Sequence, residues 1–358
     1  MTNLGFLFKT VRGLEELASQ EILEKLSVIK LIFFPYGPRG WIKCEIEDYS
    51  LKDVQRLRSI IEAYVILREE EYDEGFSIDH FADNVVKVIP IYTPHARRIT
   101  VSAYSSHRKP SQKEIQGAFA KRIVKELDAE CNFKNYDTAL RITLLRKVAL
   151  ATINLEIQPG NMPKKLETHP TPILPPIAYC MIRSASPQED EHLLDPMCGC
   201  GTIPCMATLE WKNLRATGSD ISSKYISCAK RNAETLGVAD RVNFMVSDVT
   251  ELADKGIEAD IIAVNPPHGI AIPTQSETGK LYDSMFDAAY KVLLQHGRIV
   301  IVTPYPQLVE ETTYKKKFQI TKTYKIHEGE LPRNIQMAQS NRYVFLILGM
   351  WKCSAQLP

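Results

Sequence analysis

The stretch that decides the fold is residues 191–220, EHLLDPMCGCGTIPCMATLEWKNLRATGSD. Its first five residues, 191–195, predict a short β-strand, and a glycine-containing turn then leads into a helical pattern at 202–211. A second strand is predicted at 214–220. A strand, a helix and a second strand in succession are typical of one unit of a parallel sheet.

The same alternation continues toward the C-terminus. The next predicted elements are a helix at 222–236, strands at 242–247 and 259–264, a helix near 280–294 and a strand at 298–303. Ser222 is the predicted N-cap of the first of these helices, and Gly237 ends it. Two successive strands at 318–326 and 342–350 indicate an antiparallel edge. The predicted fold is therefore α/β, a mostly parallel, doubly wound, Rossmann-like sheet with an antiparallel edge.

The N-terminal half has a less regular pattern. Predicted helices are 11–26, 51–68 and 111–128, and predicted strands are 30–34, 41–46, 98–103, 140–145 and 148–157. This mixture indicates an α+β region. A proline-rich run from Pro159 to Pro176 follows it, and because proline fixes φ and lacks an N–H, the run predicts a linker.

Composition and length set broad limits on the class of protein. The 358 residues predict two or three domains, and 44% hydrophobic and 24% charged residues are typical of a globular protein. No run approaches the ~20 apolar residues of a membrane span, and the N-terminus lacks a signal-peptide pattern. We therefore expect a cytoplasmic protein.

The eight cysteines form no C-x-x-C pair and show no zinc-finger spacing, so no metal site is expected. Without a secretory signal, reduced thiols are the expected state. Cys180, Cys205 and Cys228 fall in apolar helical patterns and are predicted to be small core residues.

The turn after the first strand, Asp195 to Thr202, is the first candidate binding element. In open α/β sheets ligands bind beyond the carboxyl ends of the strands, and glycine lets the backbone approach a ligand closely. The turn lacks the Lys-Ser/Thr of a P-loop and the full dinucleotide spacing, so it is not phosphate-specific. A tight strand–helix turn without a ligand is the alternative interpretation.

Two acidic residues follow the next two strands. Asp220 closes the second strand, where a carboxylate can accept hydrogen bonds from both ribose hydroxyls, although it could instead be a helix N-terminal charge. Asp248 follows the third strand and can accept from an adenine amino group, and Val249 offers a backbone N–H. Taken alone, Asp248 could equally be a turn residue.

The segment Asn265-Pro266-Pro267-His268 follows the apolar strand 259–264 directly. Two prolines fix the backbone, so the Asn265 side chain and the Pro266 carbonyl point in defined directions. Both can accept hydrogen bonds, and together they can hold the two N–H groups of an exocyclic amine. This arrangement would hold the nitrogen lone pair toward an electrophile, and His268 offers a flat ring for stacking. A helix-blocking turn is the alternative interpretation.

These motifs together resemble the class I amino-methyltransferases over residues 170–350. Within that class, Asp195-Pro196-Met197-Cys198-Gly199 resembles the THUMP-containing RNA guanine-N2 methyltransferases, and residues 98–128 resemble a THUMP core. The resemblance implies four parts: a ferredoxin-like domain at 1–60, a THUMP RNA-binding domain at 61–158, a linker at 159–176, and a Rossmann-fold methyltransferase domain at 177–358.

The resemblance also implies the cofactor, S-adenosylmethionine, and the residues of its site. Those expected at the cofactor are Pro172, Leu174, Asp195, Met197, Cys198, Gly199, Gly201, Thr202, Asp220, Ile221, Asp248, Val249 and Asn265. The residues expected to orient the target amine are Asn265, Pro266, Pro267 and His268. The family usually carries Tyr, Phe or Trp in place of His268 and Ser in place of Cys200.

Basic residues are concentrated between residues 97 and 165, although the whole chain has a net charge of only +1. Such clusters bind phosphates in a salt-sensitive way and carry little sequence information. The residues predicted to bind RNA are Arg97, Arg98, Arg108, Lys109, Lys113, Lys121, Lys164 and Lys165, and the pair Arg146-Lys147 lies in the same stretch.

The resemblance implies methylation of the exocyclic N2 amine of a guanosine in tRNA, at position 6 of the acceptor stem, through base flipping and in-line transfer. Position 10 with one or two methyl groups, an adenine-N6 nucleic-acid methyltransferase and a protein glutamine methyltransferase are alternatives, and a SAM-binding RNA chaperone is the non-enzymatic one. The expected partner is tRNA, with no DNA or membrane. A small protein activator or a homo-oligomer is an open question.

Overall fold

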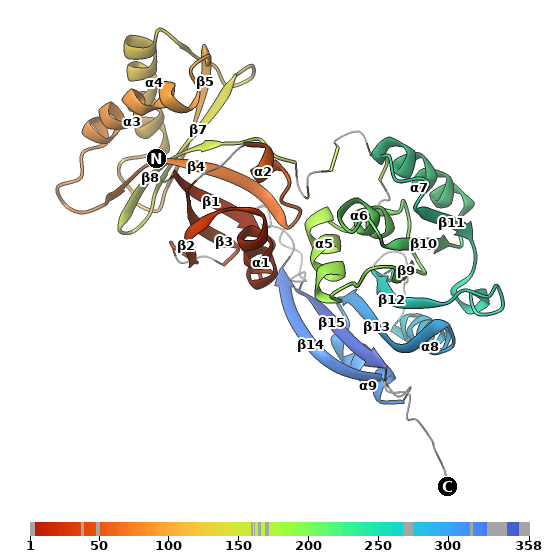
Figure 1. The fold of residues 1–358 in the computed structure, drawn as a ribbon. Coiled ribbons are helices and arrows are strands. Elements are labelled where there is room, and N and C mark those ends of the chain that lie inside the picture. The colour runs from red at the N-terminus through yellow and green to blue at the C-terminus, as the bar shows by residue number, and fades with distance from the viewer. Residues whose placement is uncertain are drawn as a thin grey trace. The chain divides into compact units, whose positions relative to one another are not determined.

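The computed structural model describes residues 4–36, 39–47, 51–158, 160, 162–163, 166–168, 172–267, 275–315, 318–327 and 342–350 (Figure 1). These residues form two compact units. The first unit is drawn from residues 1–10 and 19–157, and the second from 11–18 and 158–358. In the described part of the chain, no helix is long and apolar enough to cross a membrane.

The first unit is built on one eight-stranded sheet with the order β2-β3-β1-β4-β8-β7-β5-β6. Its strands are β1 (Leu4–Thr10), β2 (Val28–Phe33), β3 (Trp41–Ile46), β4 (Ile60–Glu71), β5 (Arg98–Ser105), β6 (Glu130–Cys131), β7 (Thr138–Leu144) and β8 (Val148–Asn154). Neighbouring strands are antiparallel except that β5 runs parallel to β6 and β7.

The first part of this sheet has a ferredoxin-like topology. In chain order it reads β1, α1 (Glu15–Lys25), β2, β3, α2 (Leu51–Gln55) and β4, and the strands lie in the order β4-β1-β3-β2. Strand β4 also pairs with β8, so it belongs to both halves of the sheet. The predicted domain boundary at residue 60 falls at the start of this shared strand, and the division into ferredoxin-like and THUMP parts stays a prediction.

The helix predicted over 51–68 is wrong beyond Gln55, because residues Ile60–Glu71 form strand β4. This segment is rich in β-branched and aromatic residues, which fit a pleated surface. It lies between β1 and β8, and Ala63 and Val65 are buried there. Pairing with two neighbouring strands outweighs the helical spacing of its apolar residues.

Helices α3 (Ile78–Tyr92) and α4 (Gln112–Leu127) pack against each other in the first unit. Phe81 and Phe119 are fully buried where they meet, with ring centroids 6.2 Å apart. Helix α4 begins with a capping box, in which Ser111 and Glu114 each accept a hydrogen bond from the other's backbone N–H. The helix predicted at 111–128 is therefore confirmed.

The second unit contains a seven-stranded sheet with the order β11-β10-β9-β12-β13-β15-β14. Its strands are β9 (His192–Asp195), β10 (Arg215–Asp220), β11 (Val242–Val246), β12 (Ala259–Val264), β13 (Leu293–Thr303), β14 (Phe318–His327) and β15 (Arg342–Met350). The first five in this order are parallel, and β15 is antiparallel to β13 and β14. The predicted doubly wound sheet with an antiparallel edge is confirmed.

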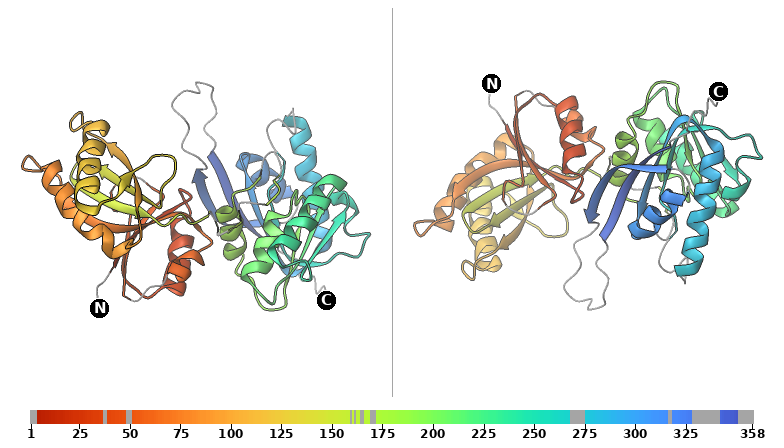
Figure 2. Two further views of the ribbon diagram at one scale, coloured as in Figure 1. Left: turned by 90° about the horizontal axis from the view of Figure 1, so that it is seen from above. Right: turned by 90° about the horizontal axis from the view of Figure 1, so that it is seen from below.

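Helices cover both faces of this sheet (Figures 1 and 2). Helices α5 (Pro175–Ser184), α6 (Thr202–Glu210) and α7 (Ser223–Leu236) pack in sequence along one face, while α8 (Gln275–Val292) and α9 (Pro306–Lys315) pack together on the other. Helix α5 starts inside the predicted linker 159–176, because proline is well tolerated in the first turn of a helix.

Candidate active site

A pocket of about 440 Å³ lies in the second unit, where β9, β10, β11 and β12 end. Strand β9 lies between β10 and β12, so the strand order reverses beside it, and ligands of α/β sheets bind at such a point. The volume is in the range of small-molecule sites. The pocket is lined by Pro172, Ile173, Asp195, Pro196, Met197, Cys198, Gly199, Cys200, Thr202, Ile203, Asp220, Ile221, Ser222, Tyr225, Asp248, Val249, Asn265, Pro266, Pro267 and Leu281.

The turn between β9 and α6 needs glycine for two different reasons. Gly199 has φ of 51° and lines the pocket, so its backbone is exposed to the ligand. Gly201 has φ of 83°, and a Cβ there would lie 2.8 Å from the Phe244 ring and 3.0 Å from Ala229. Gly201 thus allows the turn to pack against its neighbours, and it does not line the pocket.

Asp220 is held in place by the backbone around it. Its Oδ2 accepts from the Gly199 N–H at 3.0 Å, and its Oδ1 accepts from the Ser222 N–H at 2.9 Å. A carboxylate has about four acceptor positions, so two bonds leave room for further donors. Both oxygens can therefore accept from the vicinal hydroxyls of a ribose without losing their support.

Asp195 is the most buried acidic residue of the pocket wall, with 2% of its surface exposed. Burial raises the pKa of its carboxyl to about 8; the N–H of Met197 lowers it and the nearby charge of Asp220 raises it further. Near neutral pH this carboxyl therefore holds its proton in the free protein. A cation bound beside it would favour the ionised form.

Asp248 and Val249 form the opposite rim of the pocket, after β11. Asp248 caps the short 3₁₀ turn η2 (Val249–Glu251), since its Oδ1 accepts from the Thr250 N–H at 2.8 Å and from its hydroxyl at 2.6 Å. These bonds lower the pKa of Asp248. The turn role of Asp248 is confirmed, and the residue also lines the pocket; its contact with an adenine amino group stays a prediction.

Asn265 and the two prolines follow β12, whose residues Ile262 and Val264 pair with β13 and are buried. Asn265 is half-buried, and all three residues line the pocket. The strand therefore holds the predicted amine-binding segment at the same pocket as Asp195 and Asp220. His268 lies outside the described residues.

The structure brings together most of the residues predicted for the cofactor. Leu174 does not line the pocket in the described part of the chain; it precedes α5 as its N-cap, and Ile173 is on the wall instead. Tyr225 on α7 and Leu281 on α8 also line the pocket, and the sequence motifs missed both. Ile221, which was predicted, is 74% exposed and presents an apolar side chain at the pocket edge.

The expectation of reduced cysteines is wrong for one pair, because Cys200 and Cys228 form a disulfide. Cys200 belongs to the glycine-containing turn and Cys228 to α7, and their Cα atoms lie 5.1 Å apart. This separation is usual for a disulfide. Nothing local in the sequence relates the two positions, since the packing of α7 against the turn brings them together.

The predicted RNA-binding residues of the first unit are mostly exposed: Arg97, Arg108, Lys109, Lys113 and Lys121. Arg98 is different, because its guanidinium donates to Asp137 at 2.6 Å, and this partner lowers the pKa of Asp137 to about 2. Lys164 and Lys165 lie outside the described residues.

The turn after β5 contacts the hairpin between β7 and β8. The Ser106 N–H donates to the Leu144 carbonyl at 2.9 Å, and His107 Nε2 lies 2.9 Å from the Leu145 carbonyl. These contacts place the pair Arg108-Lys109 close to the exposed pair Arg146-Lys147. Two basic pairs that are far apart in sequence thus share one end of the sheet.

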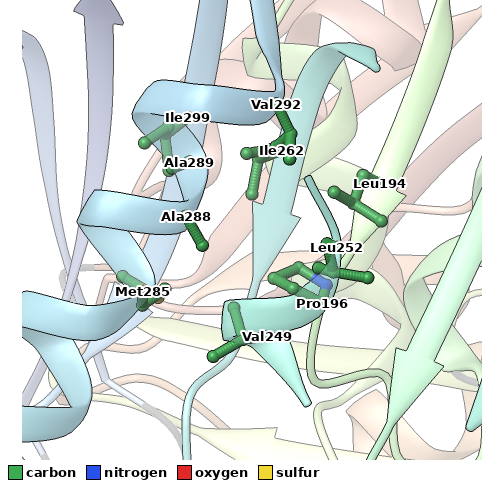
Figure 3. A pocket seen from close by; sticks show the side chains of 10 residues that line it. All are labelled: Leu194, Pro196, Val249, Leu252, Ile262, Met285, Ala288, Ala289, Val292 and Ile299. Atoms are coloured by element: carbon green, nitrogen blue, oxygen red, sulfur yellow. The ribbon is translucent and has the colours of Figure 1, made fainter. Parts of the chain in front are cut away.

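A second, much smaller cavity of about 10 Å³ lies between the sheet and α8 (Figure 3). All of its lining side chains are apolar: Leu194, Pro196, Val249, Leu252, Ile262, Met285, Ala288, Ala289, Val292 and Ile299. A void of this size can barely hold one water, and an apolar lining gives that water no partner. It is a packing gap of the core.

Residues 164–334 match the UPF0020 family, described as the RMKL-like methyltransferase domain. The chain is 27% identical over 200 residues to a tRNA (guanine(6)-N2)-methyltransferase of Methanocaldococcus jannaschii. The matched region covers 46% of this chain and 52% of that protein. It is 31% identical over 198 residues to a protein of the same name from Archaeoglobus fulgidus, covering 48% of this chain and 50% of that one. The chain thus spans about half the length of the curated relatives it matches.

The crystal structure of TrmN from Thermus thermophilus has the same fold over nearly the whole chain. The two agree with a TM-score of 0.83 at 17% identity, over 97% of this chain and 100% of that one. The doubly wound sheet and the pocket at its switch point give the second unit the architecture of the class I methyltransferases. Residues 164–334 are similar to the RMKL-like methyltransferase domain, and the cofactor of this class is S-adenosylmethionine.

Proposed function

We propose that this protein methylates the exocyclic N2 amine of a guanosine in tRNA, at position 6 of the acceptor stem. Asn265, Pro266 and Pro267 carry the proposal, because they line the same pocket as the acidic residues of the cofactor site. The names of the two curated relatives support guanine-N2 and position 6.

The pocket residues fit S-adenosylmethionine by their chemistry. In this proposal Asp220 holds the ribose, Asp248 and Val249 hold the adenine, and the buried Asp195 lies at the positively charged methionine side; the support is that all four residues line one pocket. The cofactor supplies a methyl group on a sulfonium, and the protein supplies orientation and electrostatics.

Asn265 and Pro266 hold the target amine. The Asn265 side-chain oxygen and the Pro266 carbonyl each accept one N–H of the amine, which turns the nitrogen lone pair toward the methyl group. No strong base is needed, because the nitrogen loses a proton readily once it is alkylated. A paired guanine is out of reach, so the base is flipped out of the stem at a cost of a few kcal/mol.

The first unit supplies the RNA-binding surface in this proposal. Arg108, Lys109, Arg146 and Lys147 gather at one end of its sheet, and exposed basic groups bind phosphates without reading the sequence. Structured RNA is recognised largely by shape and backbone contacts, which suits this arrangement.

The test is transfer of labelled methyl groups from S-adenosylmethionine to unmodified tRNA transcripts, followed by nucleoside analysis and mapping. We expect N2-methylguanosine at position 6, and its loss in Asn265→Ala. N2-methylguanosine or its dimethyl form at position 10 would assign the target to position 10 instead of position 6. N6-methyladenosine, or no transfer to tRNA by protein that binds the cofactor, would overturn the proposal.

A further inference from the structure

Asn232 is a buried polar residue of the second unit that lies behind the cofactor pocket. It is on α7, is 6% exposed and does not itself line the pocket. Its Nδ2 donates to the Cys200 carbonyl at 3.0 Å and to the Glu167 carbonyl at 2.9 Å. Its Oδ1 accepts from the Glu167 N–H at 2.9 Å. One amide thus satisfies three backbone groups.

The two partners of Asn232 lie in separate segments of the chain, and one of them, Cys200, lines the pocket. Cys200 lies on the wall in the turn after β9, next to Gly199, whose N–H holds Asp220. Glu167 lies in the short described segment 166–168, which precedes the lining residues Pro172 and Ile173 in the chain and does not itself line the pocket. Asn232 therefore attaches to α7 both the turn that lines the pocket and the 166–168 segment.

We propose that Asn232 is a positioning residue for S-adenosylmethionine, which fixes the glycine-containing turn and the 166–168 segment to α7 in the geometry that binds the cofactor. The cofactor would contact the turn, and Asn232 sets the position of that turn relative to α7 and the 166–168 segment. The inference extends the cofactor site and does not depend on the identity of the RNA target.

The chemistry of the site requires an amide of this length. The two N–H groups of Nδ2 serve two carbonyls while Oδ1 serves an N–H, and a carboxylate cannot donate to either carbonyl. A buried backbone group left without a partner costs about as much as a lost hydrogen bond, so the turn and the 166–168 segment would shift toward other partners or water. Asn232→Asp is therefore as damaging as Asn232→Ala, despite its equal size.

The surface next to Asn232 provides a matched control. Arg231, the preceding residue, forms a two-pronged ion pair with the Glu167 side chain at 2.6 and 2.7 Å, and both side chains are about half exposed. An exposed ion pair contributes little. Arg231→Ala removes this contact to the same segment and leaves the three bonds of Asn232 intact.

The experiment compares Asn232→Ala, Asn232→Asp, Arg231→Ala and the unchanged full-length protein by calorimetric titration with S-adenosylhomocysteine, which needs no RNA. We expect about tenfold weaker binding or more in both Asn232 variants, and less than a twofold change in Arg231→Ala. In steady-state methylation, the KM for S-adenosylmethionine should rise in the Asn232 variants, with kcat and the KM for tRNA within about twofold.

Thermal unfolding without ligand separates positioning from general stability. Unchanged S-adenosylhomocysteine affinity in folded Asn232 variants with a lower Tm would overturn the inference and leave Asn232 as a packing residue. Equal loss of affinity in Arg231→Ala would also overturn it, because the exposed ion pair would then hold the segment. A failure of the proposed tRNA target would leave the titration result unaffected.

Discussion

The cofactor pocket of the second unit and the basic surface of the first unit are organised in opposite ways. The pocket is formed where four parallel strands end, so residues from separate motifs converge on one small volume. The basic residues lie on exposed turns and helix surfaces and line no common pocket in the described part of the chain, although two pairs share one end of the sheet; Arg98 is paired with Asp137. Convergent sites should therefore lose function through single substitutions, whereas the dispersed surface should lose it gradually.

The largest effect is expected at the convergent site, from Asn265→Ala. Removing an acceptor that orients the reacting amine should lower kcat by roughly 100-fold or more, as loss of a single oriented catalytic group does. S-adenosylhomocysteine affinity should change far less. Methylation of tRNA at saturating substrate measures kcat, and calorimetry measures the S-adenosylhomocysteine affinity. A kcat within threefold of that of the unchanged protein would remove Asn265 from the mechanism.

The disulfide that joins the pocket turn to α7 should contribute to stability. Cys200 and Cys228 are 28 residues apart, and closing a loop of that size stabilises the folded state by about 3.6 kcal/mol in the chain-entropy model. Cys228→Ser should lose this free energy of unfolding when measured by urea denaturation in oxidising buffer. The difference should vanish when both proteins are reduced, and its persistence there would point to packing.

Asp220→Ala tests whether one carboxylate holds the ribose. Hydrogen bonds to a charged group contribute about 1.5–3 kcal/mol, so S-adenosylhomocysteine should bind roughly 10- to 100-fold more weakly. The substitution also removes the acceptor for the Gly199 N–H, so Asp220→Asn, which keeps one acceptor oxygen, should lose less. Equal affinities in calorimetry for all three proteins would exclude this role.

The raised pKa of Asp195 predicts proton release on cofactor binding. The free carboxyl has a pKa of about 8, against an ordinary value of 3.8, and a nearby cation lowers it. At pH 7, binding of S-adenosylmethionine should release up to about one proton, seen as a buffer-dependent enthalpy. In Asp195→Asn, cofactor binding should release fewer protons, and the difference should equal the protons that Asp195 gives up in the unchanged protein.

The same shift has a consequence for stability. Because the folded-state pKa of Asp195 is above the unfolded value, the folded protein binds the extra proton between about pH 4 and 8. The Asp195 contribution to the free energy of unfolding therefore falls as pH rises through this window. In Asp195→Asn the loss of stability over that range should be smaller, and an identical pH profile would argue against the shift.

The smallest effects are expected on the dispersed basic surface. Lys109→Ala or Arg146→Ala should weaken tRNA binding modestly and without sequence preference, and each should reduce the slope of log affinity against log salt by about 1 or less. Arg98→Ala should have less effect, because Asp137 already pairs with its charge. Filter binding over a salt series measures these slopes; a loss as large as that of Asn265→Ala would mean that the first unit also has a convergent site.

The sequence alone determined the parallel sheet and most of its pocket. Each motif sits at or just after the end of a parallel strand, and parallel strands end at the same edge, so Asp195, Asp220, Asp248 and Asn265 were predictable as neighbours. Apolar runs such as 259–264, together with the N-cap Ser222, defined these elements locally.

The tertiary structure decided what depends on contacts between distant elements. Strand β4 looks helical by its spacing but is held in the sheet by two neighbouring strands, and β1 and α3 escaped prediction. Tyr225, Leu281, the Cys200–Cys228 disulfide and the three bonds of Asn232 arise from the packing of helices against the turn and sheet. Hydrophobic periodicity shows which side of a helix is buried, but only the packed fold decides which residue that side meets.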